Sequence, residues 1–296
     1  MGLNVIKPRE ITYLSSNAVV ESYPVWNATT TFNTEDRCIY ENTIYQSMAD
    51  GNLNVIPSDD PLKWNKEQAT NPYALLDGRT TARTETVGTY VGEFSFTKSD
   101  ALSLIDVTGS VLTIEELDES DVVFATHTHN ITEVDDASGW LDFFLQDIPE
   151  ESTTNIEQKI TLDQVQKVRI TVTGANPKIG FLVVGRVKDL GCVKWGISPS
   201  FINPTPPIKN SFGNVTLVKG NFQTKIDMDV WFDTKDIDSI YFEFAKMQDE
   251  ALYFTADSRY RALKTYGYIS SFVPILESEN SASYSLSIES FVKGDL

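Results

Sequence analysis

Apolar and polar residues alternate at every second position in several separate parts of this sequence. Phe94-Ser95-Phe96 is a short case, and Val168 to Thr173 is a longer one. Further along, Ile226, Met228, Val230 and Phe232 alternate with polar or amphipathic neighbours. A period of two places alternate side chains on opposite faces of a strand, so one face is buried and the other is wet. We therefore predict a mainly β protein.

The chain of 296 residues is long enough for three consecutive units. We predict a small carbohydrate-binding-like β module over 1–70, a jelly-roll β-sandwich over 71–199, and an α+β assembly module over 200–296. The run Ile179 to Gly185 is apolar throughout and predicts a central strand covered on both faces. The proline-rich segment 198–207 cannot continue a hydrogen-bonded ladder, so we place a boundary there.

One helix is expected in the third unit. Ile237, Ile240, Tyr241 and Phe244 recur at three- and four-residue spacing, and Asp233 or Thr234 is available as the N-cap, so Asp233 to Met247 is predicted as an amphipathic helix. A closing strand is predicted around Tyr284, Leu286 and Ile288, which alternate with polar residues.

The charge balance restricts the partners. With 42 acidic and 24 basic residues the net charge is −18, so a phosphate backbone or an anionic membrane surface is repelled. The start of the sequence lacks the pattern of a signal peptide, and no apolar run approaches the length of a membrane span. Cys38 and Cys192 fall in different predicted units, which favours two reduced thiols. We expect folding in a cytoplasm, no membrane insertion and no sequence-specific nucleic-acid binding.

His127 and His129 are the two histidines of the chain, and their spacing places both on one side of a strand. Two imidazoles could ligate one transition metal if Asp121, Asp135 or symmetry-related chains completed the site; the alternative is a surface loop without metal. Nucleophile-elbow and phosphate-loop motifs are missing from the sequence. Paired acids such as Glu115-Glu116 are typical of a solvated surface in so acidic a chain. We therefore predict neither an enzyme nor a cofactor.

Aromatic residues supply the other candidate sites. The first unit has three aromatic candidates for stacking on a glycan or a partner: Trp26, Tyr45 and Trp64. The alternative for these residues, and for Tyr40, is that they form the core of this small module. In the third unit the candidates for a subunit contact are Trp231, Phe242, Tyr253 and Phe254, with core packing as the alternative.

The first unit resembles a known family. Tyr23-Pro24-Val25-Trp26, the run Phe32 to Ser47, Asn54, Pro57 and Trp64 resemble the chitinase-type carbohydrate-binding modules. The shared pattern is an aromatic start, a short strand ending in Tyr, a turn, an aromatic strand, an Asn/Pro loop and a final Trp. The chain departs from the family at Asn42-Thr43, where a turn Gly is usual, and in lacking further loop aromatics. The resemblance implies glycan binding by the exposed aromatics.

The rest of the chain looks like two further patterns. Asn71 to Thr84 is similar to the opening of a discoidin-like jelly roll. A longer pattern resembles tail-associated virion proteins of tailed bacteriophages. It consists, in order, of Trp64, this opening, Val183 to Arg186, Asp189 to Gly191, Phe212 to Val218 and Tyr266 to Ile269. This resemblance implies a structural component of the virion tail, assembled in the host cytoplasm as a symmetric homo-oligomeric ring or sleeve with other tail proteins. The alternative is a receptor-recognition or adhesin protein that binds a host surface glycan.

Overall fold

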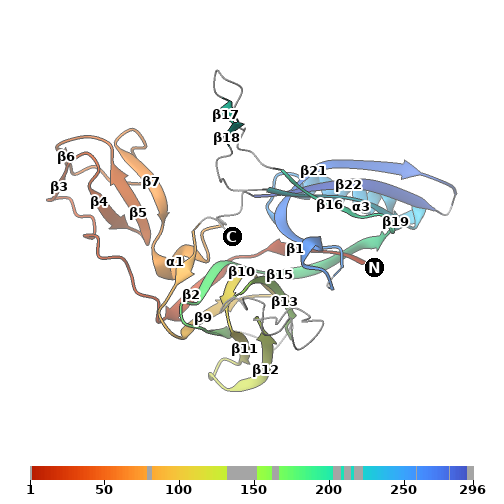
Figure 1. Cartoon of the computed structure of the whole chain (residues 1–296), viewed down its shortest axis with the longest axis horizontal. Coiled ribbons are helices and arrows are strands. Elements are labelled where there is room, and N and C mark those ends of the chain that lie inside the picture. The colour runs from red at the N-terminus through yellow and green to blue at the C-terminus, as the bar shows by residue number, and fades with distance from the viewer. Residues whose placement is uncertain are drawn as a thin grey trace.

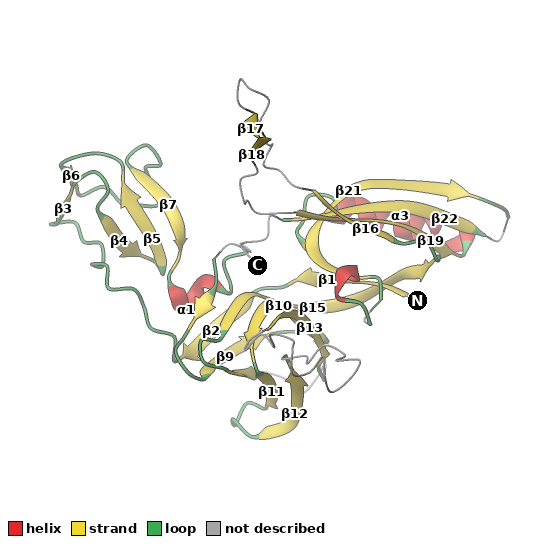
Figure 2. Cartoon of the chain, viewed as in Figure 1, coloured by secondary structure: helices red, strands yellow, loops and turns green. Residues whose placement is uncertain are grey.

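The computed structural model describes residues 2–78, 82–131, 152–161, 167–202, 208–209, 215–216, 223–257, 259–279 and 281–291. The fold is mainly β with antiparallel pairing between its strands, as predicted. Figures 1 and 2 show a small lobe containing β3 to β7, a sandwich around β9 to β14, and a third lobe in which β19, β21 and β22 lie beside helix α3.

The small lobe is built on two short sheets. One sheet has the order β4-β5-β7, and β3 pairs with β6. Glu41 and Asn42 both have positive φ, which is the conformation of a type I′ turn between β4 and β5. Asn42 therefore occupies the turn where the resembled family usually has glycine, because asparagine tolerates the left-handed region. The elements are β3 (Thr31–Phe32), β4 (Arg37–Tyr40), β5 (Thr43–Ser47), β6 (Asn52–Leu53), β7 (Trp64–Ala69) and the following helix α1 (Asn71–Ala74).

The second lobe is a two-sheet sandwich, as predicted for this part of the chain. Its outer sheet has the order β12-β11-β14-β9-β2 and faces strands β13, β10 and β15 of a larger sheet. Buried side chains from both sheets form the core between them, including Phe94, Leu104, Ile114, Ile170 and Leu182. The strands are β2 (Ile11–Ser16), β8 (Thr84–Glu85), β9 (Tyr90–Phe96), β10 (Ala101–Gly109), β11 (Val111–Leu117), β12 (Val123–Asn130), β13 (Ser152–Lys159), β14 (Lys167–Thr173) and β15 (Lys178–Val193).

Strand β15 belongs to two lobes. Its first half pairs with β10, from Thr108↔Lys178 to Ala101↔Gly185. Its second half pairs with β1 (Gly2–Pro8), from Pro8↔Gly185 to Gly2↔Cys192. The predicted central strand Ile179 to Gly185 is confirmed, because its residues are buried throughout. Gly185 lies where β1 and β10 both meet β15, and a Cβ there would lie 2.1 Å from the carbonyl oxygen of Lys7.

The third lobe is a closed six-stranded barrel. The strands follow the order β15-β1-β20-β21-β22-β19, and β19 returns to β15 through Cys192↔Trp231 and Val193↔Val230. The side strand β16 pairs with β19 outside this ring. The elements are β16 (Ser198–Ile202), β17 (Ile208–Lys209), β18 (Val215–Thr216), β19 (Gln223–Phe232), β20 (Leu252–Thr255), the 3₁₀ turn Arg261–Leu263, β21 (Lys264–Leu276) and β22 (Ala282–Ser290).

Helix α3 (Ile237–Met247) is the predicted amphipathic helix, and it begins four residues later than expected because Thr234–Asp236 form a 3₁₀ turn first. The Asp233 side chain accepts a hydrogen bond from the Lys235 backbone N–H, as expected of an N-cap. Phe244 and Met247 are buried against the barrel, and Phe244 stacks on Phe272 with ring centroids 4.3 Å apart.

Two boundary predictions differ from the structure. β1 pairs with β15 and β20, and β2 pairs with β9, so residues 2–16 belong to the barrel and the sandwich, not to the small module. The segment predicted to break the ladder starts with β16, which pairs with β19 from Ser198 to Ile202. Pro199 is accommodated because β16 is an edge strand, where a proline nitrogen can face away from the ladder.

Candidate functional site

Two of the three aromatic residues predicted to stack on a glycan are in the core of the small lobe. Trp64 is only 2% exposed, packs edge-on against Phe32, and donates its Nε1 hydrogen to the Val55 carbonyl at 3.0 Å. Tyr45 is buried as well, and this burial raises its pKa. Cys38 completes the cluster, and its burial raises the thiol pKa to about 11. Tyr45 and Trp64 are therefore not stacking residues: a module of this size needs them for its own core.

Trp26 is the exception, because its side chain is half-buried. It packs edge-on against Tyr40 with ring centroids 5.5 Å apart. Burial and the nearby Glu41 carboxylate raise the pKa of Tyr40. Most of the large apolar side chains that this lobe exposes are aliphatic and cannot provide the flat ring face that a sugar stacks on. These exposed aliphatic residues are Val25, Met48, Leu53, Ile56 and Leu62.

The two histidines lie on one side of β12, as predicted, but each has its own partner. His127 Nε2 lies 2.8 Å from Glu116 Oε1, and His129 Nε2 lies 3.0 Å from Gln158 Oε1. Asp121 accepts a hydrogen bond from Lys167, and Asp135 lies outside the described residues. Within the described ranges, no three His, Cys, Asp or Glu side chains are grouped to hold a metal ion. In the structure each histidine thus makes a hydrogen bond to a separate side chain of the sandwich.

The predicted subunit-contact residues divide into two pairs. Trp231 and Phe242 are exposed, and Phe242 presents 60% of its surface to solvent. Tyr253 and Phe254 are at most 1% exposed, which excludes them from a subunit contact. The reason is that both faces of β20 are covered by packed side chains. Phe254 faces the barrel interior, and Tyr253 faces a second buried cluster with Ile6 and Phe181.

Among the described residues, two strands of the barrel sheet, β21 and β16, have an edge with no partner strand. In the part of the chain that the structure describes, β21 pairs with β20 only from Lys264 to Gly267, so Tyr268–Leu276 pairs on one side only, with β22. At the other side β16 pairs only with β19. A monomeric protein normally shields such edges, because unpaired N–H and C=O groups accept further strands. We call Tyr268–Leu276 the β21 edge and Ser198–Ile202 the β16 edge.

Both edges carry exposed large apolar side chains. Every residue of β16 is exposed, and Phe201 presents 77% of its surface to solvent. On the β21 edge the exposed apolar residues are Val273, Ile275 and Leu276. Neither the β16 edge nor the β21 edge contains a charged residue, nor does the segment Trp195–Ile197 that leads into β16. In a chain of net charge −18, these neutral edges are where two copies can approach with the least repulsion.

A groove separates α3 from the β21 edge. It has a volume of about 290 Å³ and is lined by Tyr241, Phe244, Ala245 and Gln248 of the helix and by Ile269 to Phe272 of the strand. A β-bulge interrupts the β21–β22 register between Ile269 and Ser271, beside this groove. The sequence predicted the helix but not the groove, because the free strand edge depends on pairing partners that periodicity does not identify. Sequence analysis also missed the exposed ring of Phe201. This residue lies in the proline-rich segment 198–207, which was predicted to be a boundary between units and not a strand.

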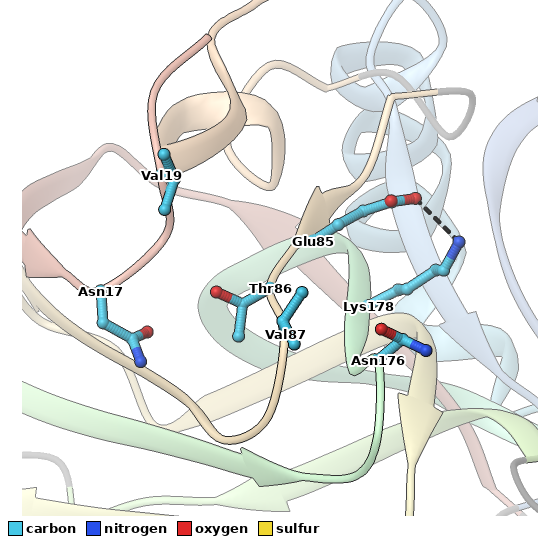
Figure 3. A pocket seen from close by; sticks show the side chains of 7 residues that line it. All are labelled: Asn17, Val19, Glu85, Thr86, Val87, Asn176 and Lys178. Atoms are coloured by element: carbon cyan, nitrogen blue, oxygen red, sulfur yellow. Dashed lines mark ion pairs between the residues drawn. The ribbon is translucent and has the colours of Figure 1, made fainter.

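A second hollow of about 560 Å³ lies on the sandwich near β8 (Figure 3). Lys178 Nζ pairs with Glu85 at 3.0 Å on one wall. Asn17 donates to the Thr89 carbonyl and accepts from the Val91 N–H, so both ends of its amide hold the fold. The other lining residues are Val19, Thr86, Val87 and Asn176. None of these seven described lining residues is aromatic, so they offer no ring face on which a sugar could stack.

Fold and surfaces together define a β-sandwich joined through one strand to a six-stranded barrel with exposed apolar edges. Among the described helices, none has the length and hydrophobicity of a membrane span. No family model and no curated protein matches this sequence.

Two solved carbohydrate-binding modules show a distant structural similarity over part of the chain. The lectin domain of lectinolysin, solved with Lewis B antigen, is 9% identical with a TM-score of 0.27. The fucose-binding module SpX-3 of Streptococcus pneumoniae is 12% identical with a TM-score of 0.26. Each comparison covers 39% of this chain and 83% of the other. TM-scores this low do not establish a shared fold.

Proposed function

We propose that this protein is a structural subunit that assembles head to tail into a closed, symmetric ring of several copies. The observation that carries the proposal is the pair of unpaired, uncharged and apolar edges on one barrel sheet. Unpaired edges of this kind favour pairing with another chain, and exposed apolar side chains favour burial against a partner.

The strand directions support a head-to-tail arrangement. From the β21 edge to the β16 edge the sheet has the order β21-β22-β19-β16, and each neighbouring pair is antiparallel. Four antiparallel strands leave the two outermost strands running in opposite directions. A second copy related by a rotation about an axis roughly along the strands therefore brings its β16 antiparallel to β21 of the first. Contacts of this kind use two different surfaces and close into a ring when the rotation divides a full turn.

The particular assembly proposed is the tail of a tailed bacteriophage, where the subunit would form a ring or sleeve with other tail proteins. The sequence resemblance supports this placement, and the acidic, mainly β chain is compatible with it. In this proposal the protein acts by burying its β16 edge against the β21 edge of the neighbouring copy.

Measurement of the molar mass by light scattering after size exclusion, with electron microscopy of the main peak, tests this function. We expect a closed ring of uniform copy number and a mass that is an integer multiple of 33.1 kDa. A 33.1 kDa monomer at all accessible concentrations would contradict the proposal. Mass spectrometry of purified virions then tests the tail placement, which requires several copies per particle.

Glycan binding by the small lobe is the second candidate function. The half-exposed Trp26 ring, held edge-on by Tyr40, supports it, because aromatic side chains with one wet face commonly bind sugars and partners. The test is binding to chitin and to host polysaccharide by the intact protein and by Trp26→Ala, with Val25→Ala as the matched control on the neighbouring exposed residue. Loss of sugar binding with Trp26→Ala alone supports a glycan site. Equal binding by all three proteins, or binding by none, removes this candidate.

A further inference from the structure

The groove between α3 and the β21 edge has the geometry of a site for strand addition. One wall is the unpaired strand segment Ile269 to Phe272, and the other is the helix surface of Tyr241, Phe244 and Ala245. Figure 1 shows α3 beside the β21–β22 hairpin. An added strand in such a site gains main-chain hydrogen bonds from the edge, and its alternate side chains fill the space beside the helix.

We infer that this groove receives strand β16 of the neighbouring copy, with Phe201 as the side chain that anchors it. This inference rests on the proposed head-to-tail assembly and names its contact. Phe201 is the most exposed side chain of the β16 edge among its large apolar residues, and it is aromatic, like the groove's own Tyr241, Phe244 and Phe272.

The strand registers place Phe201 on the correct face of the sheet. Pro199 lies opposite Ile226, Ile226 opposite Ile288, and Ile288 opposite Ile269. Ile226 and Ile288 face the barrel interior, which is also the face that α3 covers. Because side chains alternate, Phe201 shares this face with Pro199. A rotation that extends the sheet preserves its faces, so the neighbour's Phe201 projects to the side of the groove.

The levels of the two edges also agree. The same chain of pairs puts Ser198 level with Ser271 and Pro199 level with Ile269. A displacement by an even number of residues keeps each side chain on its face. A stagger of two residues brings Phe201 opposite Ile269 and one of four residues brings it opposite Phe272, the groove residues on that face. In a closed ring such a stagger arises when the strands tilt against the ring axis, as they do in a β-barrel.

The groove has room for the ring. A cavity of about 150 Å³ is enough for benzene, and this groove measures about 290 Å³. The electrostatics are permissive as well, because neither the β16 edge nor the β21 edge carries a charge, although each copy has a net charge of −18. A charged edge on such chains would repel its neighbour.

Prolines in both edges limit the number of backbone hydrogen bonds that can form between two copies. Pro199 in β16 and Pro274 in β21 each lack an N–H. The two edges can therefore form only part of a ladder, which also blunts unspecific pairing with other chains. An interface of this kind depends on a side-chain anchor, which is the role that we assign to Phe201.

Two variants of the full-length protein test the inference. Phe201→Ser removes the anchor, and Ala245→Arg fills the groove from an exposed helix position. We expect each to raise the protein concentration needed for assembly about 30-fold, as for loss of an interface hot spot. Trp195→Ser, in the exposed segment that precedes β16, and Phe242→Ser, on α3 but outside the groove, are the matched controls and should assemble like the unmodified protein. Thermal unfolding of each variant monitors the fold.

Mixing the two variants gives the decisive result. Phe201→Ser retains an open groove and Ala245→Arg retains Phe201, so one intact contact can form between them and we expect a 1:1 dimer. A mixture that stays monomeric would overturn the inference, since an isologous contact cannot be rescued in this way. If the unmodified protein forms rings and both variants form them equally well, Phe201 is not the anchor and only the ring proposal stands. A monomeric unmodified protein overturns both.

Discussion

His127 and His129 lie two residues apart on β12, yet they meet different surroundings. Glu116, the partner of His127, is 1% exposed and also accepts a hydrogen bond from the Thr161 backbone N–H at 3.2 Å. Gln158, the partner of His129, is only partly buried and donates to the Lys159 carbonyl. The first contact therefore satisfies a buried carboxylate, whereas the second ties down a side chain that water can reach.

The difference predicts unequal effects of the two alanine substitutions. His127→Ala leaves a buried carboxylate oxygen without its partner and should lower the free energy of unfolding by about 1–3 kcal/mol. His129→Ala should lower it by less than about 1 kcal/mol, because water can replace the imidazole at Gln158. Urea unfolding followed by far-UV circular dichroism measures both. Equal losses would show that the burial of Glu116 does not set the cost.

At the scale of single residues, the sequence could not predict which of its aromatic side chains are buried and which are exposed. Trp26 and Trp64 both fit the pattern of the small module, and only the structure separates a half-buried ring from a core ring. Tyr253 and Phe254 were candidates for a contact, and both are buried because a hydrophobic cluster covers each face of β20. Burial of an aromatic ring depends on what packs across from it, which spacing along the chain does not record.

At the scale of elements, local patterns were reliable and distant pairings were not. The alternation at Val168 to Thr173 and at Ile226 to Phe232 marks strands β14 and β19, and the three- and four-residue spacing marks α3. The pairing of β1 with β15 joins Gly2 to Cys192, and no local pattern reports a partner so far away. The prolines near β16 suggested a linker, because proline breaks central strands but is tolerated at a sheet edge.

The crossing of β1, β10 and β15 predicts a strict requirement for glycine at position 185. Gly185→Ala would place a Cβ 2.1 Å from the Lys7 carbonyl oxygen, so β1 must move away from β15. We expect destabilisation by about 3 kcal/mol or more, at the upper end of the cost of overpacking. Gly2→Ala on the same strand pair is the control, since its Cβ would meet only the Asp189 side chain at 3.5 Å. Thermal unfolding of both variants checks this, and equal midpoints would refute it.

At the scale of the whole molecule, charge and apolar surface act in opposite directions. Each copy carries a net charge of −18, which repels other copies, whereas the β16 and β21 edges favour contact. Repulsion between charges that stay in solvent is screened by salt, while burial of apolar side chains is not weakened by it. Assembly should therefore respond to ionic strength in a defined direction.

We predict that added salt strengthens the association of copies. Raising the sodium chloride concentration from about 0.05 M to about 0.5 M shortens the screening length severalfold and should lower the protein concentration needed for assembly by roughly tenfold. Sedimentation velocity across this range measures the shift, with Phe201→Ser at the same salt concentrations as the control. Weaker association at high salt would mean that ion pairs, not neutral edges, hold the copies together.

The sixteen residues of β15 run without a break from the sandwich into the barrel. A tensile load applied to the sandwich would thus reach the barrel through one covalent backbone, braced by β10 on the first half and by β1 on the second. Because these antiparallel ladders lie alongside the direction of pull, their hydrogen bonds would be loaded in shear together instead of opening one at a time. The sandwich and the barrel would therefore resist such a load together. Gly185 is the residue at which the pairing partner of β15 changes from β10 to β1.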